Sequence, residues 1–107
     1  MDPAILIANL RRQVGGSRDG ALLRFSLANA LAAAGDHAGA ASACREALVF
    51  DANYSAAWKL LGKSLAQVGD TAGAIDAYEQ GIAAAERRGD KQAGKEMHVF
   101  LRRLRLA

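Results

Sequence analysis

A period of 34 residues constrains the fold of this 107-residue chain more than any other feature of its sequence. The Gly-Asp pair at 35–36 recurs at 69–70, and the Ala-Gly-Ala triplet at 38–40 recurs at 72–74. A fixed period of about 20 to 50 residues is typical of stacked repeat proteins, whose units bury their apolar faces against one another. The sequence therefore predicts a single small domain built as a stack.

The composition favours helices along the whole chain. Apolar residues make up 51% of the sequence, but aromatic residues only 6%, and there is a single proline. Much of the apolar fraction is alanine and leucine, which are strong helix formers. We therefore expect an all-α fold with about six helices.

Apolar residues three and four apart, interrupted by glycine and aspartate, place the helices. One domain, 1–107, is expected to hold an N-terminal helix at 2–15, a helix pair within 21–54, a second pair within 55–88 and a C-terminal capping helix at 90–105. Asp2 should cap the first helix, and Ser55 the second pair. No breaker corresponding to the Asp-Ala-Asn segment at 51–53 follows the last paired helix, which should therefore reach Arg88.

The second unit resembles the tetratricopeptide repeat, whose pattern is W-x2-L-G-x2-Y followed by A-x3-F. The pattern is matched by Trp58, Leu61, Gly62, Ala74 and Tyr78, while Leu65 replaces its tyrosine. The first unit keeps Leu27, Ala40 and Ala47, but has Arg24, Ala28, Leu31 and Cys44 at the other positions. The resemblance implies a right-handed α-solenoid of antiparallel helix pairs. It gives structural roles to Leu27, Ala40, Trp58, Leu61, Gly62, Ala74 and Tyr78.

In tetratricopeptide proteins, the first helices of the repeats line a concave groove that holds segments of other proteins. The resemblance therefore also implies a binding site for such a segment. Its residues here are Leu22, Phe25, Asn29, Ala33, Ala56, Lys59, Lys63 and Gln67. Two lysines four residues apart share a helix face, which suits a peptide with an apolar side chain and a carboxylate. The alternative is that both lysines are solvated and the N-terminal helix covers Leu22 and Phe25. The Lys/Asn clamp of some family members is not predicted, because Phe25 and Leu60 stand where it needs Lys and Asn.

Positive charge is concentrated at the C-terminal end. Residues 87–107 hold seven basic and two acidic residues, a net charge of +5, whereas residues 1–86 hold seven basic and nine acidic residues, a net charge of −2. The candidate basic surface comprises Arg87, Arg88, Lys91, Lys95, Arg102 and Arg103. Such a surface suits an acidic protein, although a solvated helix face is the alternative. Nucleic acid is less expected, because no aromatic platform is interleaved with the charges.

No group of residues predicts catalysis, a metal site or a cofactor. His37 and His98 lie far apart without ligands at metal spacing, and the lone Cys44 stands in the place of a buried aromatic residue. We therefore expect no enzyme. No apolar run is long enough to cross a membrane, and the N-terminus lacks the order of a signal peptide. A cytoplasmic location is expected.

These observations predict a non-catalytic protein–protein interaction module, a scaffold or adaptor that binds a segment of a partner protein in the groove. The basic C-terminal end favours an acidic partner. A self-associating structural protein, such as a homodimer, is the alternative. A nucleic-acid-associated protein that uses the C-terminal helix is a less favoured reading.

Overall fold

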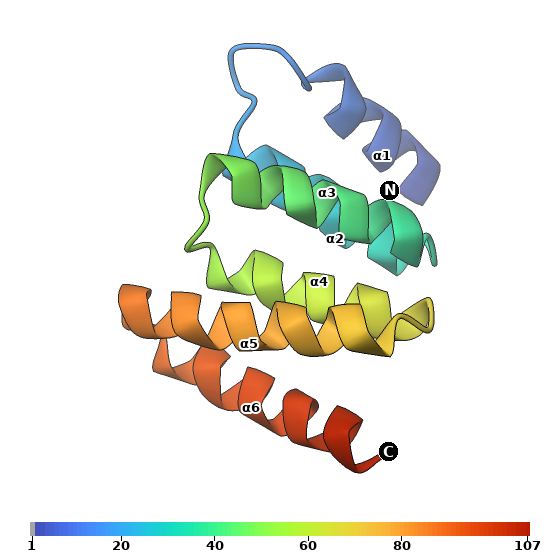
Figure 1. The fold of residues 1–107 in the computed structure, drawn as a ribbon. Coiled ribbons are helices and arrows are strands. Elements are labelled where there is room, and N and C mark those ends of the chain that lie inside the picture. The colour runs from blue at the N-terminus through green and yellow to red at the C-terminus, as the bar shows by residue number, and fades with distance from the viewer. Residues whose placement is uncertain (1) are drawn as a thin grey trace.

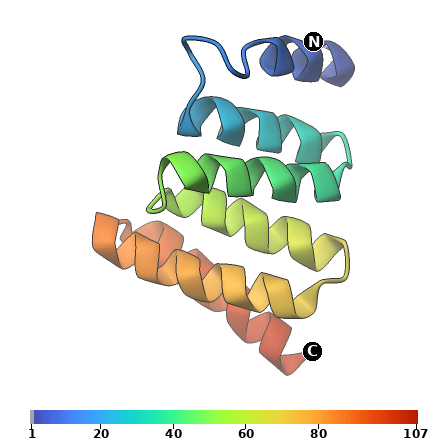
Figure 2. The ribbon, with the colours of Figure 1, turned by 45° about the horizontal axis from the view of Figure 1, so that its top comes forward.

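The computed structural model describes residues 2–107, which form an all-α stack. The elements are α1 (Pro3–Arg12), α2 (Ala21–Ala33), α3 (His37–Phe50), α4 (Ser55–Gln67), α5 (Thr71–Arg88) and α6 (Lys91–Leu106). The helices follow one another in chain order along the stack, and the two termini lie at opposite ends (Figure 2). The expected fold class, an all-α solenoid of helix pairs, is confirmed.

Three Gly-Asp pairs, at 35–36, 69–70 and 89–90, turn the chain from one helix into the next. Each glycine has a φ between 76° and 86°, which is the left-handed region that a residue with a side chain rarely adopts. Each following aspartate accepts a hydrogen bond from a backbone N–H of the next helix's first turn. This combination ends one helix and begins another within two residues.

The helices of each pair, α2–α3 and α4–α5, lie side by side (Figure 1). The two pairs bury matching positions. In the second pair, the ring of Tyr78 lies directly against Gly62, where a Cβ atom would collide with it. In the first pair, the corresponding residues are Cys44 and Ala28, which are both fully buried. In the first pair, the second helix has a smaller side chain, Cys44 in place of an aromatic residue. The first helix has a larger one, Ala28 in place of glycine, so the two departures from the repeat pattern compensate each other.

Arg24 and Trp58 occupy the same position in successive units and hold the loop before their helix in different ways. The indole Nε1 of Trp58 donates a 2.8 Å hydrogen bond to the Ala52 carbonyl. The guanidinium of Arg24 donates two bonds to Asp19 and also reaches Glu46. These contacts hold the pKa of Asp19 well below its ordinary value. An ion-pair cluster therefore replaces the indole in the first unit.

The last helix, α6, corresponds to α2 and α4, the first helices of the two pairs. Equivalent residues of α4 and α6 are 36 positions apart, whereas those of α2 and α4 are 34 positions apart. Buried Ala93, Met97 and Leu101 of α6 correspond to buried Ala57, Leu61 and Leu65 of α4. The extra two residues arise because α5 has 18 residues where α3 has 14, while its connection to the next helix is two residues shorter. Because α4 touches both α2 and α6, the three helices form one layer.

Two local expectations were wrong. The N-terminal helix was expected to span 2–15, but α1 ends at Arg12. Beyond it the chain turns at Gly15, whose φ is 83° and whose N–H donates to the Asp19 carboxylate. Ser55 lies inside the first turn of α4 and caps nothing, because its hydroxyl donates a 2.8 Å hydrogen bond to Asp90 across the stack.

Candidate binding groove and C-terminal face

Four of the eight predicted groove residues line one pocket between α2 and α4. The pocket has a volume of about 330 Å³. Asn29 and Ala33 come from α2, and Lys63 and Gln67 come from α4. The turn of helix that separates the members of each pair places them on the same face, so the two helices present them together. The other lining residues are Ala32, His37, Leu60 and Ser64.

Ser64 is the unusual member of this pocket. Its side chain is 1% exposed, yet within residues 2–107 its Oγ has no hydrogen-bond partner. A buried hydroxyl without a partner is unfavourable, because it has lost water without gaining a replacement. In the equivalent position of α6 stands Phe100, whose ring packs against Tyr78 of α5. The small polar residue thus leaves a hollow with an unsatisfied group in its wall.

Three other predicted groove residues lie outside the pocket. Leu22 is 70% exposed, so the N-terminal helix does not cover it. Phe25 packs its ring against Tyr54, with 5.0 Å between ring centroids. Ala56 is half-buried. These residues extend the apolar character of the inner layer, but do not join Asn29 and Lys63.

The expected pair of free ammonium groups is not formed. The Nζ of Lys59 lies 3.1 Å from a carboxylate oxygen of Glu96 on α6, and this contact lowers the pKa of Glu96. The Nζ of Lys63 lies 5.9 Å from the centre of the Phe100 ring, also on α6. Lys63 is exposed and lines the pocket, whereas Lys59 is already neutralised. One cation, therefore, remains for a ligand.

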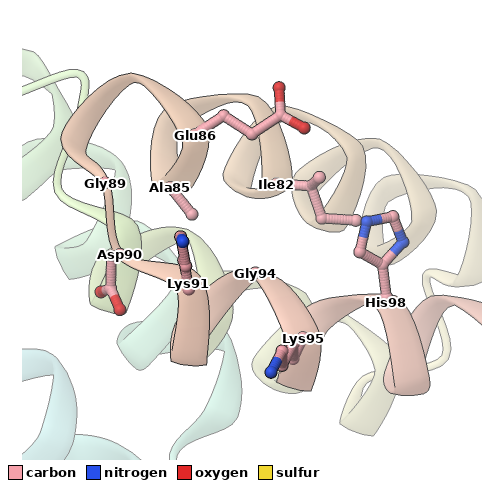
Figure 3. Close-up of a pocket in the computed structure, with 9 residues that line it drawn as sticks. All are labelled: Ile82, Ala85, Glu86, Gly89, Asp90, Lys91, Gly94, Lys95 and His98. Atoms are coloured by element: carbon pink, nitrogen blue, oxygen red, sulfur yellow. The ribbon is translucent and has the colours of Figure 1, made fainter.

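A second pocket, of about 350 Å³, lies between α5 and α6 at the C-terminal end of the stack (Figure 3). Ile82 and Ala85 contribute apolar surface from α5, and Gly94 and His98 contribute from α6. Its other lining residues are Glu86, Gly89, Asp90, Lys91 and Lys95. The sequence alone did not predict this pocket, because it depends on how the last helix crosses the one before it.

The six predicted basic residues are all exposed, but they divide into two groups. Arg87 donates to the side chain of Asn53, and Arg88 pairs with Asp51, so both hold the loop between α3 and α4. The other four are Lys91, Lys95, Arg102 and Arg103, which form no ion pair or hydrogen bond within residues 2–107. Within the predicted basic surface, the unpaired positive charge therefore lies on α6.

Neither a metal site nor a reactive cysteine is present in the described part of the chain. Residues 2–107 contain no cluster of three or more histidine, cysteine or carboxylate side chains. Cys44 is fully buried, and desolvation raises the pKa of its thiol to about 12, so it is uncharged at neutral pH. Among the described helices, none has both the length and the apolar character needed to cross a membrane.

Comparison with known proteins places this arrangement among tetratricopeptide-repeat structures. The chain is 48% identical over 100 residues to a TPR repeat-containing protein of Pseudomonas aeruginosa, covering 94% of this chain and 95% of the relative. It is similar to a solution structure of a Bordetella parapertussis protein at 46% identity, with a TM-score of 0.80 and coverage of 92% and 86% of the two chains. The Sgt2 TPR domain of Aspergillus fumigatus gives 26% identity and a TM-score of 0.72, with 94% and 69% covered. No family model matches the chain.

Proposed function

This chain belongs to the tetratricopeptide-repeat family, whose domains are generally protein-interaction modules, and from that membership we propose that it binds a short segment of a partner protein between α2 and α4. The proposed activity is non-catalytic. The buried, protonated Cys44 supports that reading, because a thiol must be accessible and ionised to act as a nucleophile.

The pocket between α2 and α4 carries the proposal. Its wall holds two exposed side-chain amides, those of Asn29 and Gln67. A peptide backbone supplies N–H and C=O groups at regular intervals, which are the partners that such side chains accept. An extended segment lying across α2 and α4 would therefore exchange hydrogen bonds with both side-chain amides.

The remaining residues of the pocket specify the chemistry of the segment. Leu60, Ala32 and Ala33 offer apolar surface, and the Nζ of Lys63 offers one positive charge. This combination suits an apolar side chain next to a carboxylate, either terminal or on a side chain. Since Lys59 is paired with Glu96, the ligand needs one carboxylate at this site rather than two.

The proposal is tested with short peptides that carry a leucine beside a glutamate or a C-terminal carboxylate. In NMR titrations, they should shift the amide signals of Asn29, Lys63, Ser64 and Gln67. Lys63→Glu should weaken binding by about tenfold or more. The matched control is Arg45→Glu on α3, an exposed residue outside this pocket, which should have little effect. If no peptide shifts these amides at millimolar concentration, the groove assignment is wrong.

An acidic partner and a cytoplasmic location stay part of this proposal, supported by the unpaired cations of α6 and by the single buried cysteine. Self-association into a homodimer also remains a prediction. Light scattering over a range of concentrations tests it directly, because a dimer requires the measured mass to rise.

A further inference from the structure

In each helix pair, the second helix covers one face of the first helix, α2 or α4. The corresponding outer face of α6 is exposed. His98 corresponds to Gly62 of α4 and to Ala28 of α2. Both of these residues are buried in their helix pairs, and Gly62 lies under the Tyr78 ring of α5. His98 is exposed, because no second helix follows α6 within residues 2–107. Within these residues, α2 and α4 are each followed by a second helix, and α6 is not.

Two hollows lie along this uncovered face and meet at His98. The pocket of about 350 Å³ runs from Ile82 and Ala85 of α5 to Gly94 of α6 (Figure 3). A second cavity, of about 260 Å³, continues toward the C-terminus and is lined by Leu101 and Leu106. Gly94 corresponds to Trp58 of α4, so the side chain that occupies this position in the preceding unit is missing here.

The charges around this face have one predominant sign. Lys91, Lys95 and Arg102 line the two hollows and have no acidic partner within residues 2–107. The first hollow is also lined by two acids, Glu86 and Asp90. Asp90 accepts hydrogen bonds from neutral donors, the Ser55 hydroxyl and the Ala93 N–H, so it keeps its negative charge. The excess of positive charge therefore comes from Arg102 at the second hollow, where Arg105 is paired with Glu79. An occupant must therefore combine an apolar face with negative charge.

We infer that this face docks an acidic amphipathic helix of another protein, which packs on α6 as α3 packs on α2 and α5 packs on α4. Its apolar side fills the hollow beside Gly94, and its carboxylates face Lys91, Lys95 and Arg102. This site lies outside the groove between α2 and α4, so it is independent of the function proposed above. An end-to-end contact with α1 of a second copy fits poorly, because α1 contains Arg11 and Arg12 and no acidic residue.

The test uses three synthetic 16-residue peptides as probes. One has leucine and alanine on one helical face and glutamate on the other. The second replaces each glutamate with lysine, and the third scrambles the first sequence so that no apolar face remains. The glutamate peptide should bind about tenfold or more tightly than the other two at low salt, and it should shift the amides of Lys91, Gly94 and His98.

Two variants examine the apolar and the charged part separately. Gly94→Leu places a leucine side chain in the hollow. A Cβ atom at this position meets only the Ala85 Cβ, at 3.7 Å, so the fold should accept the substitution. This variant should abolish binding. Lys91→Glu combined with Lys95→Glu should weaken binding by about fivefold to tenfold. Arg18→Glu, an exposed residue in the loop before α2, is the matched control and should change nothing.

Several outcomes would overturn the inference. If the glutamate peptide shifted only the amides of Asn29, Lys63 and Gln67, its binding site would be the groove between α2 and α4. Equal binding of the glutamate and scrambled peptides would reduce the contact to unspecific attraction of charge. Tighter binding of a 15-nucleotide oligothymidine to the same amides would assign the face to nucleic acid. A dimer that Gly94→Leu dissociates would assign it to a second copy.

Discussion

A single buried hydroxyl, that of Ser64, lowers the stability of this protein. Ser64→Ala removes the unpartnered group, so the free energy of unfolding should rise by about 1–2 kcal/mol. Affinity for a peptide in the groove should stay unchanged in the same variant, because protein atoms cover the Oγ. Urea denaturation measures the first effect and an NMR titration the second.

The control for this prediction is Ser42→Ala on the exposed side of α3. It changes helix propensity alone, for which we expect about 0.5 kcal/mol or less. A loss of stability in Ser64→Ala would show that the hydroxyl has a partner in solution.

Two helical glycines, Gly62 and Gly94, occupy opposite environments and should respond oppositely to alanine. A Cβ atom on Gly62 collides with the Tyr78 ring, which is buried and cannot easily move. We expect Gly62→Ala to cost about 1–3 kcal/mol of stability. Gly94→Ala meets only an ordinary contact and should stabilise by about 0.5–1 kcal/mol. Equal effects in urea denaturation would mean that α4 and α5 are less closely packed than described.

Asp90 links stability to pH. The hydrogen bond from Ser55, together with that from the Ala93 N–H, lowers the pKa of Asp90 below its ordinary value of 3.8. A carboxylate with a lowered pKa in the folded state stabilises the fold above the pKa of the unfolded chain, and this contribution is lost as the pH falls. The free energy of unfolding should therefore drop between about pH 5 and pH 2, less steeply in Asp90→Asn and Ser55→Ala than in the natural chain. Parallel curves would contradict this role.

At the scale of helices, the sequence predicts most of the fold, because the residues at its turns show where one helix ends and the next begins. Glycine followed by aspartate ends one helix and begins the next, so α2 and α3, and likewise α4 and α5, could be placed within a residue or two. The register of α6 could not be predicted from the 34-residue period. The longer α5 and the shorter connection after it move the equivalent positions to a spacing of 36.

The groove residues were predicted with uneven success, again because of α6. Asn29, Ala33, Lys63 and Gln67 follow from helical spacing, and they do meet in one pocket. The pairing of Lys59 with Glu96 joins residues 37 positions apart, which no local pattern reveals. The contribution of Ser64 was also missed, since its significance depends on how completely the neighbouring helices bury it.

The helix α1 is the element that should open most readily. It has no buried residue, and only Ile7 and Leu10 pack against the core cluster. Local opening exposes little apolar surface there, so it requires little free energy. In native-state hydrogen exchange, the amides of α1 should exchange well before those of α4. Equal protection would mean that α1 and the paired helices unfold together.

For the whole molecule, Trp58 joins the two parts of the core. Its ring packs against the cluster around Leu27 and Leu61 as well as the cluster around Tyr78 and Met97. The two parts should therefore unfold together, and tryptophan fluorescence and far-UV circular dichroism should give coincident urea transitions. Trp58→Ala should lower the free energy of unfolding by about 3 kcal/mol, and Trp58→Phe by less. Separate transitions in the natural chain would show that the clusters are independent.

The contacts of Lys59 and Lys63 with α6 also limit the reach of the groove. Glu96 and Phe100 contact the lysines of α4 on the inner surface between α4 and α6, whereas the interval between α2 and α4 is hollow. Neighbouring helix axes lie about 8–10 Å apart, and an extended chain advances about 3.3 Å per residue. A peptide therefore crosses this interval with about three residues, so recognition depends on a tripeptide-sized motif, and lengthening the ligand adds few contacts in the groove.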